Sequence, residues 1–494
     1  MFEDRKAVSV LFASTLAFTL CFAAWMLNGV LVTYLVEAKI FEWTNSQVGW
    51  LIGIPVLTGS ILRLPVGLLT DRFGGRPIFI GLLLLSSFFM WTLSLANSYG
   101  QFLLTSLGFG ISGASFAVGI AYTSLWFKKE HQGTALGIFG AGNAGSALTS
   151  LGAPSLLLIL TQHGANPEGW RRLPWIYSLV LLATAVFFFF FTYPRKVEST
   201  GKTLKAQLAP LSNIRVWRFC LYYFYVFGGF VALAQWLIPY YVNVYSMSLV
   251  TAGLLASIFS LPSGVIRALG GWMSDHYGAR RVMYWVFTIC LICSALLIFP
   301  RMDVYTPGPG VQAKYGGKVT SVSPSEVVVD GERKYTVQAA RESVKQETET
   351  MVFPASRSWQ EPVVEVGSVV KKKQLLAKGV THIYFQANVW IFTLLVFVVG
   401  ILMGIGKAAV YKHIPTYFPS DVGVVGGIVG VVGGLGGFLC PILFGYLLED
   451  TGIWTTCWVF FVVLVAICLG WMHWVIQKMM HETEPGLMRR FEKQ

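Results

Sequence analysis

Charged side chains are scarce in this sequence. Asp, Glu, Lys and Arg together make up 12% of the 494 residues, whereas soluble domains carry about 25%. This share points away from a protein that is surrounded by water on all sides. The seven cysteines all fall in apolar stretches, so we expect neither a disulfide framework nor a Cys-x-x-Cys metal site. We expect no metal and no cofactor.

Long apolar runs are abundant instead. Hydrophobic residues make up 55% of the chain, and stretches such as Val8–Val36, Gly100–Phe127 and Ile453–Ile476 contain no charge. Each reaches the roughly 20 residues that a helix needs to cross a bilayer. About twelve such runs follow one another. The sequence therefore predicts an all-α polytopic membrane protein with twelve transmembrane helices.

The net charge of +13 is explained by where the basic residues lie. Lys and Arg gather in alternate loops, which is the pattern of cytoplasmic loops in membrane proteins. The clusters are Arg5/Lys6, Arg72/Arg76, Lys128/Lys129, Arg195/Lys196, Arg280/Arg281, Lys412 and Arg489/Arg490. We therefore expect a multi-pass protein of the inner (cytoplasmic) membrane with both termini in the cytoplasm. The charge indicates topology, and we expect lipid around the chain and no nucleic-acid partner.

The chain contains an internal repeat. Arg63–Arg76 aligns with Arg267–Arg280, with the same spacing from the arginine to the following aspartate. Gly137–Asn143 similarly matches Gly427–Gly433. These pairs predict two six-helix halves, and parallel repeats of this kind place the substrate site near the bilayer midplane, where the halves meet.

Four segments follow from the repeat. We expect an N-terminal half at 1–193, a cytoplasmic linker at 194–215 and a C-terminal half at 216–494. The second repeat is more widely separated than the first, which indicates an insertion at 301–384. Because this insertion joins helices nine and ten, it is expected on the outer side, where it is open to binding a partner. The carrier itself is expected to be a monomer.

The insertion has the composition of a small β domain. Its β-branched runs are broken by Gly, Pro and Ser, which are strand and turn signals. The expected strands are Lys318–Val322, Glu326–Asp330, Tyr335–Val337 and Val363–Gly367.

Arg63 and Arg267 are the main candidates for a binding site. Each lies about eight residues inside its helix end, which is roughly 12 Å of depth at 1.5 Å per residue. An arginine at that depth costs at least about 2.5–3.5 kcal/mol. Two simpler explanations would offset this cost. The arginine could pair with a carboxylate on another helix, or its own side chain could extend to the membrane surface. We favour a third explanation, in which both arginines bind one anion, because a guanidinium donates two parallel hydrogen bonds to a flat oxyanion.

Several other residues allow two interpretations. Lys407 is either a third cation on the anion path or a side chain that extends to the surface, and His413 is interfacial or a proton relay. The glycines within 133–152 and 423–437 allow close helix packing, and direct contact with the substrate stays open. Asn143 either links helices or donates its amide to the oxyanion, and we favour the second.

Two sets of motifs resemble known transporters. Gly67–Arg76 resembles the cytoplasmic loop motif of the major facilitator superfamily, through Gly67, Asp71, Arg72, Gly74 and Arg76, with Asp275 and Arg280 at the matching positions of the second half. Gly137–Gly145 and Gly426–Phe438 resemble the two signatures of the nitrate/nitrite porter family. The resemblance covers the whole chain except the insertion.

This resemblance implies a site and a substrate. In the family, the anion binds between the paired arginines, and aromatic rings enclose it. The matching residues are Arg63, Arg267, Asn143, Gly140, Gly430, Phe116, Tyr223 and Phe227. Each aromatic ring is also open to a simple packing role. The insertion and Lys407 depart from the family's pattern, and Lys407 therefore leaves the coupling ion open.

The sequence thus predicts a secondary active transporter of nitrate and nitrite that works by alternating access. Exchange of nitrate for nitrite and symport of nitrate with protons are both open. One alternative is an exchanger of another small anion, such as formate or oxalate. Another is a receptor or scaffold that displays the β insertion. We expect no enzyme, because no nucleophile–base pair, metal cluster or phosphate loop is in register.

Overall fold

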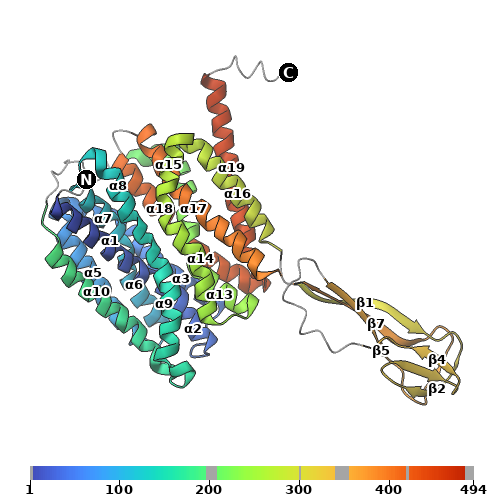
Figure 1. Ribbon diagram of the computed structural model, residues 1–494. Helices are drawn as coiled ribbons and strands as arrows, with labels where there is room; N and C mark the ends of the chain where they lie inside the picture. The colour runs from blue at the N-terminus through green and yellow to red at the C-terminus, as the bar shows by residue number, and fades with distance from the viewer. Residues whose placement is uncertain are drawn as a thin grey trace. The chain divides into compact units, whose positions relative to one another are not determined.

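The computed structural model describes residues 4–195, 209–299, 302–339, 355–385, 387–418 and 422–483. The chain divides into two compact units, one formed by Met1–Ile298 with Thr393–Gln494 and the other by Phe299–Phe392. The first is a bundle of long helices and the second is built of strands (Figure 1). Most of the expected linker lies outside the described residues.

The first six spans are mostly made of more than one helical segment. In chain order they are α1 Arg5–Trp25 with α2 Leu27–Glu37, α3 Asn45–Ile61 with α4 Arg63–Phe73, α5 Gly75–Leu93, α6 Tyr99–Phe109 with α7 Ser115–Ser124, α8 Lys129–Gly140 with α9 Gly145–Leu160, and α10 Arg172–Phe191. Short 3₁₀ turns link α6 to α7 and α8 to α9, at Gly110–Ala114 and Ala141–Ala144.

The second six spans follow the same plan. They are α12 Ile214–Tyr223 with α13 Gly229–Tyr245, α14 Leu249–Val265 with α15 Arg267–Tyr277, α16 Ala279–Leu296, α17 Val389–Tyr417, α18 Val422–Thr451 and α19 Thr456–Thr483. Among the described residues, eleven helices are long and apolar enough to cross a membrane, and the bent pair α14–α15 makes twelve. The predicted twelve-helix architecture is confirmed.

Spans two and eight are interrupted directly before the two arginines. Leu62 separates α3 from α4, and Ile266 separates α14 from α15, where the axis bends by 48°. In span two, Pro65 has no N–H to donate to the carbonyl one turn earlier, which explains a break at this point. Each arginine is therefore the first residue of a half-helix.

The two half-helices also end alike. Gly74 and Gly278 have φ angles of 89° and 84°, a conformation that glycine adopts without a steric penalty. These two glycines of the repeated motif thus stop α4 and α15 at equivalent places.

Glycines bring the two halves into contact along spans two and eleven. A Cβ added to Gly49 would lie 2.4 Å from the carbonyl oxygen of Pro441, and one added to Gly53 would lie 2.6 Å from that of Phe438. Such distances allow no side chain, so α3 and α18 cross backbone to backbone.

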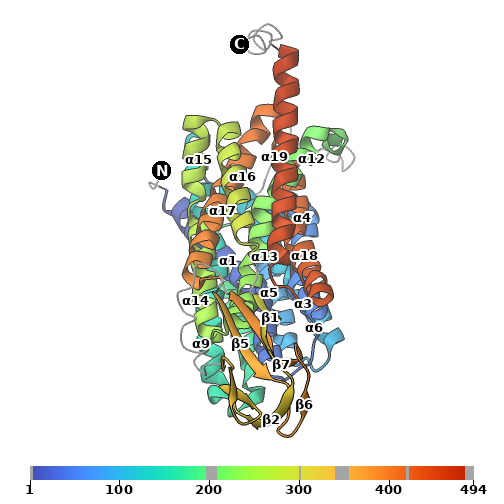
Figure 2. The same ribbon diagram turned by 90° about the vertical axis from the view of Figure 1, so that its right-hand side faces the viewer.

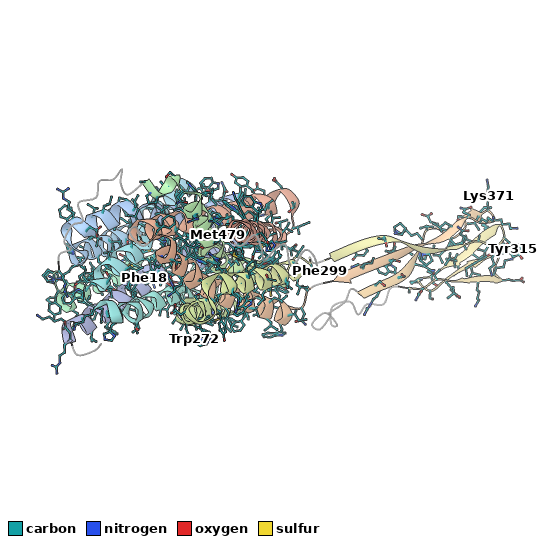
Figure 3. All side chains as sticks on the ribbon, turned by 90° about the horizontal axis from the view of Figure 1, so that it is seen from above. Phe18, Trp272, Phe299, Tyr315, Lys371 and Met479 are labelled. Atoms are coloured by element: carbon teal, nitrogen blue, oxygen red, sulfur yellow. The ribbon has the colours of Figure 1, made fainter. Side chains whose placement is uncertain are left out.

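The β unit contains two antiparallel sheets. One has the order β1-β7-β5, formed by Met302–Gln312, Leu375–Phe385 and Ala355–Pro362. The other has the order β4-β3-β2-β6, formed by Arg333–Thr336, Glu326–Val329, Gly317–Val322 and Val369–Val370. Figure 2 shows β1, β7 and β5 running alongside one another, and Figure 3 shows Tyr315 and Lys371 at one end of this unit.

Three of the four expected strands correspond to β2, β3 and β4. The fourth was wrong, because Val363–Gly367 forms no strand. Gly367 takes a φ of 92° and donates to the carbonyl of Val319, so this segment turns from the end of β5 toward the second sheet. The valines of this segment suggested a strand, but the turn at Gly367 prevents a continuous extended backbone.

Candidate anion site

Arg63 is buried where the two halves meet. Only 5% of it is exposed. Its Nη1 donates to the carbonyl oxygen of Gly430 in α18, at 2.9 Å, and its Nε donates to that of Gly113, at 3.4 Å. Its guanidinium carbon lies 5.0 Å from the ring centroid of Phe227 and 5.6 Å from that of Phe116. Arg63 therefore contacts both halves.

Arg267 approaches the same ring from the other half. Its guanidinium carbon lies 5.5 Å from the ring centroids of both Phe116 and Tyr411. Its Nη1 is buried and has no hydrogen-bond partner among the described residues. The two arginines thus share the ring of Phe116, and Arg267 keeps a donor that protein atoms leave unused.

No carboxylate of the described residues pairs with either arginine. The ion pairs of this part of the chain lie elsewhere, for example between Lys412 and Asp275. The burial of Arg63 also differs from a side chain that extends to the membrane surface. Because a charge in this environment costs several kcal/mol when it is not neutralised, the site is suited to an anion.

A π-helical turn arranges the aromatic residues of span seven. Phe224–Gly228 is π-helical, a feature that occurs frequently at functional sites. Next to it, the rings of Tyr223 and Phe227 stack with centroids 5.1 Å apart and planes 12° apart. The Tyr223 hydroxyl is buried, and its ring lies against that of Tyr411. Tyr223 thus brings a polar group to the pair of rings.

The signature glycines lie beside the guanidinium groups. A Cβ on Gly140 would be 3.8 Å from Cδ of Arg267, and one on Gly430 would be 3.8 Å from Nη1 of Arg63. Asn143 donates its amide to the carbonyl of Gly140, at 3.0 Å, while its buried Oδ1 has no partner in the described part of the chain. Asn143 therefore lies next to Gly140, with its amide bonded inside its own span.

Sequence reasoning missed two aromatic residues. Tyr411 lies under Arg267, crosses Tyr223 at 71° with centroids 5.0 Å apart, and donates to the carbonyl of Gly426. Trp25 lies 5.8 Å from the guanidinium carbon of Arg63 and donates to the carbonyl of Pro55. Tyr411 follows Lys407 by one helical turn, so the two share a helix face. That spacing could have indicated Tyr411 as a further candidate. Trp25 lies in a uniformly apolar run, which gives none.

Lys407 is fully buried in α17, with 0% exposed. Its Nζ lies 3.3 Å from Oγ of Ser263 and 3.1 Å from the ring centroid of Phe230. The ammonium therefore does not reach the surface, which was one of its two interpretations.

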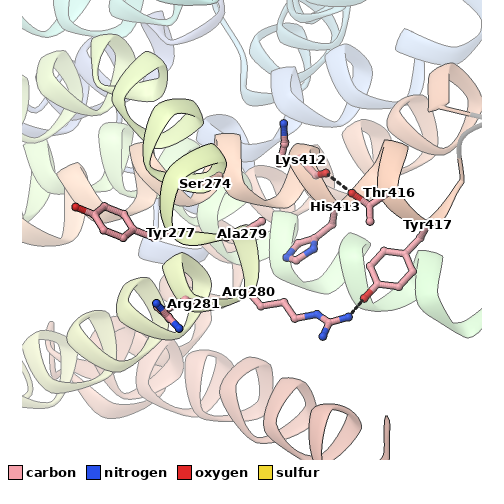
Figure 4. A pocket seen from close by; sticks show the side chains of 10 residues that line it. Ser274, Tyr277, Ala279, Arg280, Arg281, Lys412, His413, Thr416 and Tyr417 are labelled. Atoms are coloured by element: carbon pink, nitrogen blue, oxygen red, sulfur yellow. Dashed lines mark hydrogen bonds between the residues drawn. The ribbon is translucent and has the colours of Figure 1, made fainter. Parts of the chain in front are cut away.

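His413 lies farther along α17, at a pocket of about 490 Å³. The pocket is lined by Ser274, Tyr277, Gly278, Ala279, Arg280, Arg281, Lys412, His413, Thr416 and Tyr417 (Figure 4). His413 is 8% exposed and stacks on Phe219. Arg280 donates to the hydroxyl of Tyr417, and Lys412 pairs with Asp275. The structure places His413 at this pocket and not beside Arg63 and Arg267.

The loop motif of the first half lies apart from the anion site. Asp71 and Arg72 are exposed, and a Cβ on Gly67 would meet no neighbour within 4 Å. Arg76 donates to the carbonyl of Phe189, at 2.5 Å.

Comparison with known proteins identifies the family. Residues 13–311 match the model of the major facilitator superfamily. The chain is 39% identical to the probable nitrate/nitrite antiporter NarK1 of Thermus thermophilus, over 99% of this chain and 96% of that protein. The chain belongs to the nitrate/nitrite porter family of the major facilitator superfamily. This porter is thus a multi-pass membrane transporter and not an enzyme.

More distant relatives agree with this membership. The porter is 25% identical to the nitrite extrusion protein of Bacillus subtilis, over 94% of this chain and 93% of that one. It is 25% identical to the probable nitrate transporter NarT of Staphylococcus epidermidis, over 91% of each chain.

Solved structures share the fold. A bacterial homologue of the human lysosomal transporter Spinster, in an inward-facing and occupied conformation, matches with a TM-score of 0.64 and 14% identity, over 96% of this chain and 98% of that one. The fucose:proton symporter FucP of Escherichia coli matches with a TM-score of 0.56 and 14% identity, over 95% and 99%.

Proposed function

We propose that this porter carries nitrate and nitrite across the cytoplasmic membrane by alternating access. The observation that supports this most is the pair of arginines, one from each half, which meet at Phe116 without an acidic partner among the described residues. The names of the relatives, which include a nitrate/nitrite antiporter and a nitrate transporter, support the choice of substrate.

The proposed site recognises a flat anion by charge and shape. Arg63 and Arg267 donate to its oxygens, and the buried Nη1 of Arg267 is suited to this role. Phe116, Tyr223 and Phe227 present ring faces and edges around the two guanidinium groups. Gly140 and Gly430 bring no side chain to the space beside the guanidinium groups, which suits a small ion, and Asn143 adds a buried amide next to Gly140.

Exchange is the simplest mode of transport. Moving one negative charge into a negative-inside cell opposes the membrane potential by about 2.3 kcal/mol per 100 mV. Outward movement of nitrite cancels this cost for each nitrate that enters. The two arginines also repel each other when no anion lies between them, which disfavours reorientation without cargo.

Symport with protons is the second candidate. It is favoured by Lys407, a buried amine in the C-terminal half that has no acidic partner among the described residues. His413, at the pocket near the end of α17, is a further candidate on the path of the anion or the proton.

We also propose the topology that the basic clusters indicate. The inner membrane holds a monomer whose halves, 1–193 and 216–494, are joined by a cytoplasmic linker at 194–215. Both termini lie in the cytoplasm. The insertion at 301–384 lies outside, where it is open to a partner.

A counterflow experiment tests the function. Purified protein in liposomes loaded with nitrite is expected to accumulate external ¹³N- or ¹⁵N-labelled nitrate. Formate or oxalate is then added outside in excess. If nitrate is the substrate, neither anion is expected to reduce the entry of labelled nitrate strongly. Failure of nitrate to enter, with rapid entry of formate, would overturn the proposed substrate.

A further inference from the structure

Glycines hold α17 against the broken span eight. A Cβ on Gly404 would lie 2.7 Å from the carbonyl oxygen of Ser263, and a Cβ on Gly270 would lie 2.6 Å from that of Ile405. This close approach brings Lys407 of α17 beside Ser263 in α14. Arg267 lies four residues after Ser263, just beyond the break at Ile266, and its charge acts on Lys407, so the amine lies in the same region as the anion-binding arginine.

The surroundings of the Lys407 amine contain no negative charge among the described residues. Helix α13 contributes the ring of Phe230, and α14 contributes the hydroxyl of Ser263. From α15, Arg267 adds a positive charge that acts on Lys407. On its own helix, the next turn carries Tyr411, whose ring lies under that same arginine.

These surroundings make the charge of Lys407 depend on the anion. An ammonium that is removed from water and lacks a counter-ion is costly, and the positive charge of Arg267 adds repulsion. A neutral amine avoids both costs and keeps an N–H that donates to the hydroxyl oxygen of Ser263. An anion held by the arginines reverses the balance, because its negative charge attracts a proton to the nearby amine.

We propose that Lys407 binds one proton together with each anion, so that this carrier drives net nitrate uptake with a proton gradient. The inference rests on the proposed function, because it requires nitrate at Arg63 and Arg267. It assigns a role to a residue that exchange alone does not need.

The proposed step is balanced in charge and atoms. The lone pair of the amine forms an N–H bond with a proton from the water on the side to which the site is open, and nitrate enters with it. After reorientation, nitrate leaves, the N–H bond breaks and the proton passes to the water on the other side. One proton and one nitrate move together, so no net charge crosses. The carrier then returns empty with a neutral amine, which removes one of the three positive charges that would otherwise repel one another in the empty site. Exchange needs no such return and no deprotonation, because an anion is bound at each reorientation.

Two variants separate coupling from transport. Lys407→Arg keeps a permanent positive charge, so it is expected to lower proton-driven net uptake at least tenfold more than nitrate/nitrite exchange. Lys407→Met has no proton to carry, so its nitrate uptake is expected to ignore a pH gradient and to be opposed by an inside-negative potential. Lys412→Gln is the matched control, because this lysine is on the same helix but pairs with Asp275.

The experiment uses liposomes without internal nitrite, an imposed pH gradient, a nitrate electrode and a pH-sensitive dye inside. The wild type and Lys412→Gln are expected to accumulate nitrate with an equal influx of protons, whatever the membrane potential. Proton-driven accumulation by either Lys407 variant at the wild-type rate would overturn the inference. So would equal loss of exchange and net uptake in both variants. Nitrate/nitrite exchange by the wild type without any proton-driven net accumulation overturns the inference and leaves the proposed function intact, whereas absence of both exchange and net uptake overturns the proposed function itself.

Discussion

At the scale of single residues, the site depends on the geometry of its cations as well as on their charge. Arg63 divides its donors between the two halves, and Arg267 retains an unused donor. A lysine at either position keeps the charge but loses the planar fork that donates two parallel hydrogen bonds.

Arg63→Lys and Arg267→Lys are therefore expected to impair exchange strongly. Loss of one charged hydrogen bond is worth about 1.5–3 kcal/mol, which corresponds to roughly a tenfold to hundredfold fall in kcat/KM. Nitrate counterflow in liposomes measures this. Arg171→Lys is the control, because Arg171 pairs with Glu168 outside the site. Wild-type kinetics in either site variant would contradict the paired-arginine mechanism.

Tyr411 gives a second residue-scale prediction. Tyr411→Leu removes the ring under Arg267, and a cation–π contact is worth about 0.5–2 kcal/mol, so nitrate affinity is expected to fall severalfold. Tyr411→Phe keeps the ring and loses the hydrogen bond to Gly426, so it is expected to keep its affinity and lose about 1 kcal/mol of stability. Calorimetric titration and thermal unfolding separate the two effects. Equal affinity in both variants would mean that the ring does not position Arg267.

At the scale of helices, the sequence predicted which spans carry the site but not how they bend. The repeat predicted Arg63 and Arg267 on equivalent spans, because residue identity and spacing are visible in the sequence. The breaks at Leu62 and Ile266 and the π turn in span seven were not predicted. Pro65 was a visible signal for the first break, whereas the break at Ile266 and the π turn depend on tertiary contacts. Glycine positions predicted close packing in general, and only the structure shows which glycines meet a neighbour.

The glycines of α18 test this distinction. A Cβ on Gly433 would lie 2.3 Å from Cδ1 of Tyr223, whereas one on Gly427 would meet nothing within 4 Å. Gly433→Ala is therefore expected to displace the Tyr223 ring, to lower stability by about 1–3 kcal/mol and to reduce transport. Gly427→Ala, on the same helix, is expected to retain both properties. The melting temperature and the counterflow rate of the two variants provide the comparison, and equal behaviour would show that α18 does not press on Tyr223.

At the scale of the whole molecule, the β unit has its own core. Val319, Val327, Val329, Val370 and Leu376 are buried together within it. Its composition predicted a separate β unit, although β1, β5 and β7 were not predicted. Pro307 and Pro309 argued against a strand at β1. The structure places β1 at the edge of its sheet, where proline is tolerated.

The pairing of β1 with β7 allows a clean deletion of this unit. Met302 and Phe385 are paired across the two strands, so their Cα atoms are about 5 Å apart, and a few glycines and serines can replace 302–385 without stretching the helices. If the chain acts as a transporter through Arg63 and Arg267, the shortened protein is expected to keep nitrate/nitrite exchange within about twofold, since loop length has a small cost in free energy. The matched control replaces only 317–336, which leaves β1 and β7 joined. A shortened protein that folds, binds nitrate and no longer transports would instead assign the β unit a part in the transport cycle, and normal exchange with loss of a cellular response would favour the receptor alternative.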